Sequence, residues 1–274
     1  ESQNAFLLYA FGERLFIRTG RRDSYGSVHH KGWMWQTKST NSITVNGQGQ
    51  EPHSDSAVGE IVDFRTSQAF DYVVGEAASA YDGKLDRFTR RILFVKPEVV
   101  LIFDQLAAPQ PATYEWHLHA PVEMTVAGQH NIQVVVKGAS CQTDMLWPVG
   151  LEVSQTDRFD PPPRPRVKLV EYHLTAKTSQ PAGKQAFVTV LRPYRTGETL
   201  KGKAHLEEIA GGFAVTVPLS DGETRILLQT KPGASLSGAG ISTDGEVGAM
   251  RFDAEGKVRA TFVVAGEKIE RSIE

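Results

Sequence analysis

Residues 90–106, RRILFVKPEVVLIFDQL, decide the fold. Two runs rich in β-branched and aromatic residues lie on either side of Pro97, whose fixed φ suits a tight turn. Both runs hold more apolar residues than a sheet with one face in water requires. The stretch therefore predicts an antiparallel hairpin that lies in the middle of a β-sandwich.

Strand-like segments continue from this hairpin toward both ends of the chain. They are short, rich in Val, Ile, Phe and Thr, and separated by Gly, Pro, Asn or Asp; examples are SITVNG, YVVGEA, YEWHLHA, NIQVVVKG, AFVTVLRPY and VRATFVVAG. No long window shows the apolar spacing of an amphipathic helix. The sequence therefore predicts an all-β fold, a large antiparallel multi-stranded β-sandwich that is supersandwich-like.

Two features divide this predicted sandwich. The proline-rich stretch at residues 156–168 lacks backbone donors for a sheet, so we expect a stiff polyproline-like excursion between strands. Near the C-terminus the chain becomes rich in glycine, and its Asp-Gly and Glu-Gly pairs predict hairpin turns. We therefore expect a β-sandwich domain at residues 1–225 and a small C-terminal β-unit at residues 226–274.

Composition excludes several classes of partner. Thirty Lys and Arg residues against 32 Asp and Glu leave a formal net charge of -2, so no global positive field attracts nucleic acid or an anionic membrane. The longest apolar run, VVLIF, is far too short for a spanning helix. The single cysteine, Cys141, cannot form an internal disulfide and has no CxxC partner, so we expect it to be buried and inert.

Several quoted segments, in order and spacing, resemble one known family. They are NAFLLYAFGERL at residues 4–15, QTKSTNSITVNGQGQ at 36–50, LDRFTRRILFVKPEVVLIFDQL at 85–106 and YEWHLHAP at 114–121. They are similar to the β-sandwich part of heparinase II/III-like polysaccharide lyases. In that family an N-terminal (α/α) toroid packs on the sandwich, and the substrate lies in the groove between them.

The resemblance implies the partners of this chain. It starts at Glu1 without a methionine or leader and holds no toroid, so we expect a C-terminal piece of a longer lyase. Its expected partners are the missing toroid and an acidic polysaccharide or oligosaccharide. The family also implies a periplasmic or secreted protein, and the isolated fragment is expected to be inactive.

The implied reaction is β-elimination on a uronic acid unit. It requires neutralisation of the sugar carboxylate, a base for the proton on carbon 5, and an acid for the leaving oxygen. By resemblance, the loop GRRDSYGSVHHKGWMW at residues 20–35 contributes to the groove. Its candidate catalytic residues are His29, His30 and Tyr25, and its candidate substrate-binding residues are Arg21, Arg22, Trp33 and Trp35.

A structural alternative exists for the same loop. If it is extended, Trp33 and Trp35 place both rings on one face, where they could fill a core while the histidines cap the loop. Adjacent residues of an extended chain point in opposite directions, so at most one of His29 and His30 would face substrate.

A metal cofactor is not expected. Relatives often bind a divalent ion through a His before the Asn-Ala-Phe-like stretch, an Asp in an Asp-Ser-Gly-like triplet, and a His before a later Asn. Here the first position falls at or before Glu1, the triplet reads Arg18, Thr19, Gly20, and Thr40 precedes the Asn. Two of the three ligands are therefore substituted.

Two other hypotheses arise from the sequence. His117, His119 and Glu123 resemble half of a cupin metal motif, but Pro111 and Val153 stand where a cupin has Gly and His. The simpler interpretation is that these histidines are hydrogen-bonded inside the sandwich. The chain could also be a non-catalytic carbohydrate-binding or structural module.

The charged residues between positions 86 and 91 also have both a functional and a structural interpretation. Asp86, Arg87, Arg90 and Arg91 could bind substrate, but the sequence favours the charged face of an exposed strand. Four further histidines have no companions in sequence and receive no role: His53, His130, His173 and His205.

Overall fold

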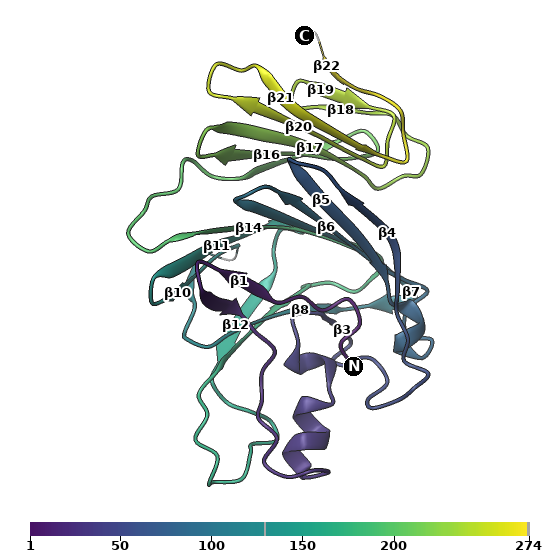
Figure 1. The fold of residues 1–274 in the computed structure, drawn as a ribbon. Coiled ribbons are helices and arrows are strands. Elements are labelled where there is room, and N and C mark those ends of the chain that lie inside the picture. The colour runs from purple at the N-terminus through teal and green to yellow at the C-terminus, as the bar shows by residue number, and fades with distance from the viewer. Residues whose placement is uncertain (129, 273–274) are drawn as a thin grey trace.

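The structure, a computed structural model, describes residues 1–128 and 130–272. Four antiparallel sheets are stacked in layers, and the C-terminal residues form the layers farthest from the N-terminus (Figure 1). The predicted all-β fold, a large antiparallel multi-stranded sandwich, is confirmed. No helix within the described part of the chain is long and apolar enough to cross a membrane.

An eight-stranded sheet forms the central layer. Its strands, in spatial order, are β4 (Glu60–Thr66), β5 (Phe70–Glu76), β6 (Arg87–Val95), β7 (Val99–Ala112), β14 (Ala182–Arg195), β11 (Ala139–Trp147), β10 (Asn131–Val136) and β9 (Thr125–Ala127). A four-stranded sheet packs on one face and consists of β12 (Glu152–Thr156), β13 (Tyr172–Lys177), β8 (Tyr114–Ala120) and β3 (Ile43–Val45). The hairpin β1 (Leu8–Ala10) and β2 (Glu13–Phe16) lies beside it.

The C-terminal strands form the other two layers. A five-stranded sheet packs on the second face of the central sheet: β15 (His205–Ile209), β16 (Gly212–Leu219), β17 (Gly222–Gln229), β20 (Val247–Asp253) and β21 (Val258–Val264). A three-stranded sheet packs outside it: β18 (Leu236–Gly238), β19 (Ile241–Thr243) and β22 (Ile269–Arg271). The short helices are η1 (His30–Met34), η2 (Thr37–Ser39) and η3 (Ala78–Tyr81).

The hairpin β6–β7 lies in the middle of the stack, as predicted. Val95 pairs with Val99 across the turn that contains Pro97. Side chains of β7 alternate between two cores, because Ile102 faces the four-stranded sheet and Phe103 faces the five-stranded sheet. This double burial explains why both arms of the hairpin are apolar.

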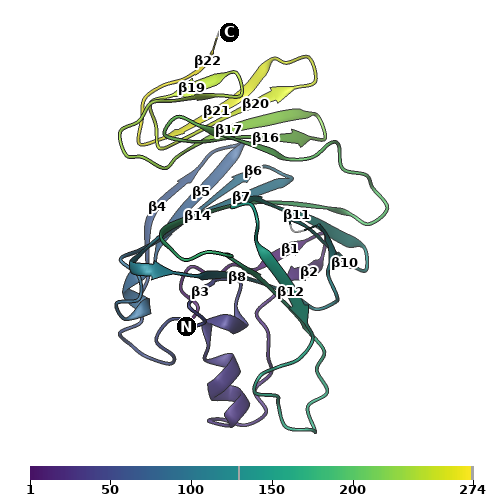
Figure 2. The same cartoon turned by 180° about the vertical axis from the view of Figure 1, so that it is seen from behind.

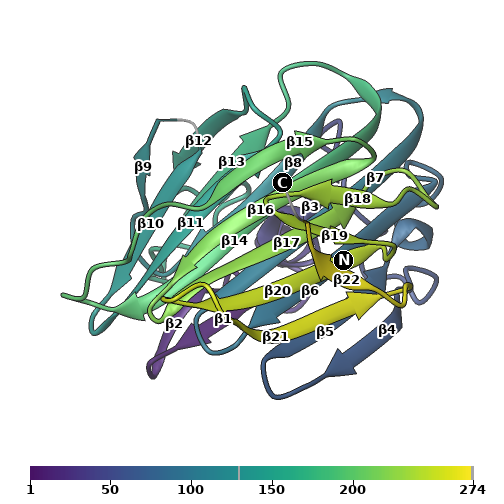
Figure 3. The same ribbon diagram turned by 90° about the horizontal axis from the view of Figure 1, so that it is seen from above.

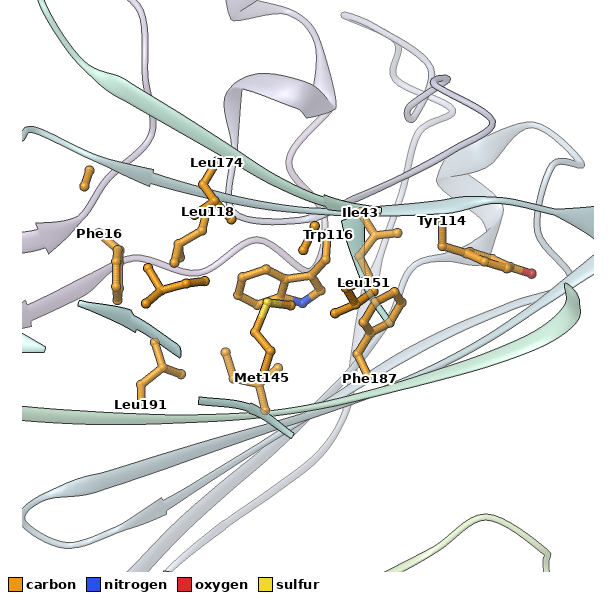
Figure 4. Close-up of a cluster of buried hydrophobic side chains, with 14 of the residues drawn as sticks. Phe16, Ile43, Tyr114, Trp116, Leu118, Met145, Leu151, Leu174, Phe187 and Leu191 are labelled. Atoms are coloured by element: carbon orange, nitrogen blue, oxygen red, sulfur yellow. The ribbon is translucent and has the colours of Figure 1, made fainter. Parts of the chain in front are cut away.

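The first core lies between the central and four-stranded sheets. Figure 4 shows Trp116 of β8 at its centre, with Met145 and Phe187 projecting from the opposite sheet. Trp116 and Phe187 are fully buried, and each contributes about 1.5–3 kcal/mol or more through removal of apolar surface from water. This core fixes the sheet that carries the candidate site on its outer face.

The charged residues on β6 do not form an exposed strand face. The interpretation as an exposed charged face is therefore wrong for Arg90 and Arg91. Arg90 is 2% exposed and makes a two-pronged ion pair with the fully buried Asp104, its direct partner on β7. Arg91 points to the other core and pairs with Glu246 at its rim. Because β6 is an interior strand with sheets on both faces, its charges must be paired inside the protein. Asp86 is the one exposed residue of the four.

The C-terminal strands form the predicted additional β-structure. Residue 225 lies inside β17, and the five-stranded sheet contains strands from both sides of this position. The predicted domain boundary between residues 225 and 226 stays a prediction. Gly256, with φ of +75°, forms the turn between β20 and β21, as expected. The Asp-Gly pair at residues 244–245 does not form a hairpin, because there the chain passes from the three-stranded to the five-stranded sheet.

Candidate functional site

The second half of the loop at residues 20–35, from Val28 to Met34, is helical rather than extended. The backbone N–H of Lys31 donates to Ser27, and that of Trp35 donates to His30, which closes the π-helical turn η1. Trp33 and Trp35 therefore do not share a strand face, so the extended geometry of that alternative is wrong, although Trp33 is buried as it proposed. Trp33 is 5% exposed, whereas Trp35 is half-buried.

Asp23 anchors the start of this loop. Its carboxylate accepts hydrogen bonds from the backbone N–H of Ser24 and from the side-chain hydroxyl of Ser27. It also accepts from the backbone N–H of Arg164, 141 residues later in the chain. The hydrogen bond from Ser27, followed by backbone donors, lowers the pKa of Asp23 to about 2.

The proline-rich segment packs against η1. No strand is present between Thr156 and Tyr172, as the prolines predicted, and the segment descends beside η1 in both side views (Figures 1 and 2). Lys38 donates to the carbonyl of Asp160, and Arg166 donates to the carbonyl of Asp23. Two segments that are remote in sequence thus form one layer outside the four-stranded sheet.

His29 and Trp33 form the interior of this layer. His29 is 1% exposed, its Nδ1 lies 2.8 Å from the carbonyl oxygen of Pro161, and its ring packs on Phe159. Since a carbonyl only accepts, Nδ1 carries the proton. Trp33 packs on Phe159 and donates from its indole nitrogen to Thr19. The candidate catalytic residue His29 and the candidate substrate-binding residue Trp33 are therefore both buried.

An aromatic and cationic surface lies on the other side of η1. Tyr25 is 69% exposed, and the rings of Trp35 and His53 stack in parallel with centroids 4.0 Å apart. Arg21 and Arg22 are also exposed. We refer to Tyr25, Trp35, His53, Arg21 and Arg22 as the η1 surface. His53, which the sequence left without a role, could be found only from the folded chain.

His30 lies directly beneath this surface. It is 6% exposed and its ring packs against Tyr25 and Trp35, with centroids 5.4 and 4.8 Å apart. Its Nδ1 accepts a hydrogen bond from the backbone N–H of Gly26. Burial, and then the positive charge of Arg22, lowers the pKa of His30, so the ring is neutral near pH 7. His29 and His30 thus point to different surroundings.

Three histidines line the face of the four-stranded sheet beneath η1. His117 bonds through Nε2 to Thr44 at 2.8 Å, and the Nδ1 atoms of His119 and His173 lie 3.2 Å apart. Burial lowers the pKa of both His117 and His173 to about 4. The pairing of β13 with β8 brings His173 to this cluster, which no sequence spacing could reveal.

The geometry does not support a cupin-like metal site. Within residues 1–128 and 130–272, no group of three or more His, Cys, Asp or Glu side chains is arranged to hold a metal ion. His117, His119 and Glu123 therefore do not form the proposed ligand set. The interpretation of the two histidines as buried, hydrogen-bonded groups agrees with their exposure of 6% and 1%.

The positions of the family's metal ligands have structural contacts here. Arg18 forms an ion pair with Glu1. Thr40 donates through its hydroxyl to the carbonyl of Thr37. The next residue, Asn41, donates to the carbonyls of Phe6 and Ile17 and accepts from the backbone N–H of His119. These contacts connect the N-terminal segment to the four-stranded sheet.

Comparison with known proteins gives one sequence family. The profile described as Heparinase II/III-like, C-terminal matches residues 1–192. No curated protein sequence matches the chain significantly.

Solved structures share the fold at low sequence identity. The heparan sulfate lyase HepC from Pedobacter heparinus is 14% identical with a TM-score of 0.66, over 83% of this chain and 36% of that one. A heparinase III structure is 12% identical with a TM-score of 0.62, over 95% of this chain and 35% of that one. The chain thus spans about a third of the length of these two proteins.

Proposed function

Since the chain belongs to the family of heparinase II/III-like C-terminal domains, we propose that it is the β-sandwich part of a polysaccharide lyase. The proposed substrate is a uronic-acid-containing polysaccharide, cleaved by β-elimination. The proposed partner is an N-terminal (α/α) toroid of the same protein, and the complete enzyme acts in the periplasm or outside the cell. The sandwich contributes one wall of the substrate groove.

The η1 surface is the observation that carries this proposal. In the parallel Trp35–His53 stack, Trp35 backs the exposed ring of His53, whose outer face offers a flat surface of the kind on which a sugar ring can lie. Arg21 and Arg22 of the same loop are exposed, and their guanidinium groups can bind a uronate carboxylate through two parallel hydrogen bonds. An aromatic surface together with cations suits an acidic sugar better than a neutral one.

The proposed division of labour follows from exposure. Arg21 and Arg22 neutralise the carboxylate, which makes the proton on carbon 5 more acidic. Tyr25 is an exposed group that carries a proton to transfer, while His30, beneath it, positions the Tyr25 and Trp35 rings. His29 remains a candidate only if the complete enzyme opens the layer formed with Phe159.

The test is a lyase assay on two proteins, this chain and the full-length product of its gene. Each is incubated with alginate, heparan sulfate, chondroitin and ulvan, and the ultraviolet absorbance of the unsaturated uronate is followed. We expect signal from the full-length protein alone. Absence of signal from both proteins on every polymer would refute the lyase assignment.

Burial of both histidines favours a second candidate function, a non-catalytic carbohydrate-binding module. In that case the full-length protein yields no unsaturated product, yet this chain binds an acidic polymer through the η1 surface. Affinity electrophoresis of the wild-type chain and its Trp35→Ala variant in gels that contain each polymer tests the binding, and the lyase assay on the full-length protein distinguishes the two functions.

A further inference from the structure

The loop that carries η1 and the proline-rich segment are hydrogen-bonded to each other outside the four-stranded sheet. We call residues 23–35 and 157–168 together the outer layer. His29 bonds through Nδ1 to the carbonyl of Pro161 at 2.8 Å, and the backbone N–H of Arg164 donates to Asp23 at 2.9 Å. The two segments of the outer layer therefore depend on each other for their position.

The seam between the outer layer and the four-stranded sheet is formed by ring contacts. In the view from above, β8, β13 and β12 run side by side (Figure 3), and His173 of β13 lies on their outer face. Its ring packs against Trp33 and Phe159, with centroids 4.6 and 4.8 Å apart. Among the residues that the structure describes, no hydrogen bond joins the outer layer to β8 or β13. The layer can therefore leave the sheet without breaking a hydrogen bond across the seam.

Two histidines beneath the outer layer fit together only while both are neutral. The Nδ1 atoms of His119 and His173 lie 3.2 Å apart, so one ring donates a hydrogen bond to the other. The accepting ring can gain a proton only on the Nδ1 that already faces an N–H, and the donating ring only on its Nε2. In the described part of the chain, both Nε2 atoms are buried without a hydrogen-bond partner. The closed layer thus leaves no favourable place for an added proton.

The surroundings of this pair also disfavour a positive charge. Burial lowers the pKa of His119 well below its usual value and that of His173 to about 4. Backbone groups of Thr40 and Lys38 beside His119, and the exposed Asp157 near His173, act in the opposite direction but are outweighed. The other titratable groups around the pair are His117 on β8, Glu115 behind Thr44, His29 across Phe159 and the ammonium group of Lys38 on η2.

Protonation is therefore coupled to the position of the outer layer. Once the layer has left the sheet, both rings meet water and regain the usual histidine pKa of about 6.5. The open state then binds more protons than the closed state between about pH 6.5 and 4, so a fall in pH through this range favours opening.

We propose that the outer layer is an acid-responsive lid, which protonation of His119 and His173 releases from the four-stranded sheet. Asp23, whose pKa is about 2, stays ionised while the lid opens, so its hydrogen bond from the backbone of the proline-rich segment still joins the two segments. Trp35 lies on the lid and His53 does not, so opening separates their stacked rings. Acid thereby alters the η1 surface while the sheets stay folded.

The test is hydrogen–deuterium exchange of the chain at about pH 7.5 and pH 5.5, followed by mass spectrometry and corrected for the intrinsic effect of pH on exchange. A single turn such as η1 has no stability of its own, so the amides of residues 28–36 report on lid opening, while those of β20 report on unfolding of the sheets. We expect the protection of residues 28–36 to fall about tenfold for each of the two histidines at the lower pH, with β20 far more protected at both. Unchanged protection of residues 28–36, or equal protection of these residues and β20, would overturn the proposal.

Variants separate these two histidines from other groups that titrate. His119→Phe/His173→Phe keeps two rings in the seam but removes both titrating groups, so the fall in protection between the two pH values should shrink by about tenfold or more. His173→Gln, which keeps a donor and an acceptor beside His119, serves as a second variant should the double variant fail to fold, and it should also reduce the fall. His205→Phe, at an exposed position on β15, is the matched control and should respond to pH as the wild type does. A fall equal to that of the wild type in a folded His173 variant would contradict the proposal. Lyase activity is not measured, so this result is independent of the proposed function.

Discussion

Removal of the Asp104 carboxylate is expected to destabilise the protein severely. Asp104 accepts from Nε of Arg90 at 2.6 Å, from its second guanidinium nitrogen at 2.8 Å, and from the indole of Trp116 at 3.0 Å. In Asp104→Ala the guanidinium stays buried with only the carbonyls of Asn4 and Asn41 as partners. Loss of one member of such a pair costs about 3–5 kcal/mol. This is a large share of the total stability of about 5–15 kcal/mol typical of folded proteins.

Urea unfolding, followed by tryptophan fluorescence, measures this loss. The companion variant Arg90→Met/Asp104→Leu removes both charges and keeps apolar volume among Phe6, Phe88 and the indole ring. We expect the double variant to be clearly more stable than Asp104→Ala, since no unpaired charge remains in the core. A loss below about 1 kcal/mol in Asp104→Ala, or equal losses in the single and double variants, would refute this reasoning.

Three further predictions concern titration and accessibility. Between about pH 6.5 and 4, His117 binds more protons in the unfolded state than in the folded state. As the pH is lowered through this range, the free energy of unfolding should therefore decrease by about 3 kcal/mol for this group. His117→Gln should flatten this pH dependence in urea titrations. Asp23→Asn should speed trypsin cleavage after Arg166, because the loop loses its charged anchor. The wild-type protein should show the same sensitivity, measured with an acid-active protease, as the pH falls from about 4 toward 2 and Asp23 becomes protonated. Equal cleavage rates in the variant and the wild type would contradict this prediction. Burial raises the pKa of the Cys141 thiol to about 12, so the native protein should resist a thiol reagent that reacts at once in urea; rapid native labelling would contradict it.

Composition was sufficient to predict the sheets but not the location of their charges. The apolar arms on either side of Pro97 placed the hairpin correctly in the centre of the stack. Arg90 and Arg91 were misinterpreted because charges in a strand usually face water. Only the pairing of β6 with β7, which sets Arg90 opposite Asp104, shows that the charge is compensated inside the core.

The candidate site shows a similar limit. The loop at residues 20–35 was recognisable from its residue types, but its helical path was not, because Gly and Ser near its start gave no amphipathic period. His29 and Trp33 are buried because Phe159 and Pro161, more than a hundred residues later, pack on them. Contacts at such separation leave no signal in the local sequence.

The most direct test of the account is the kcat/KM of the full-length gene product carrying Trp35→Ala, measured on the polysaccharide that the wild-type protein cleaves. The account predicts a decrease of about tenfold or more, equivalent to about 1.4 kcal/mol of transition-state stabilisation, in a variant that remains folded. Phe64→Ala, which removes an exposed ring from the edge strand β4, should leave kcat/KM unchanged. An unchanged kcat/KM in Trp35→Ala would contradict the claim that the η1 surface forms a wall of the substrate groove.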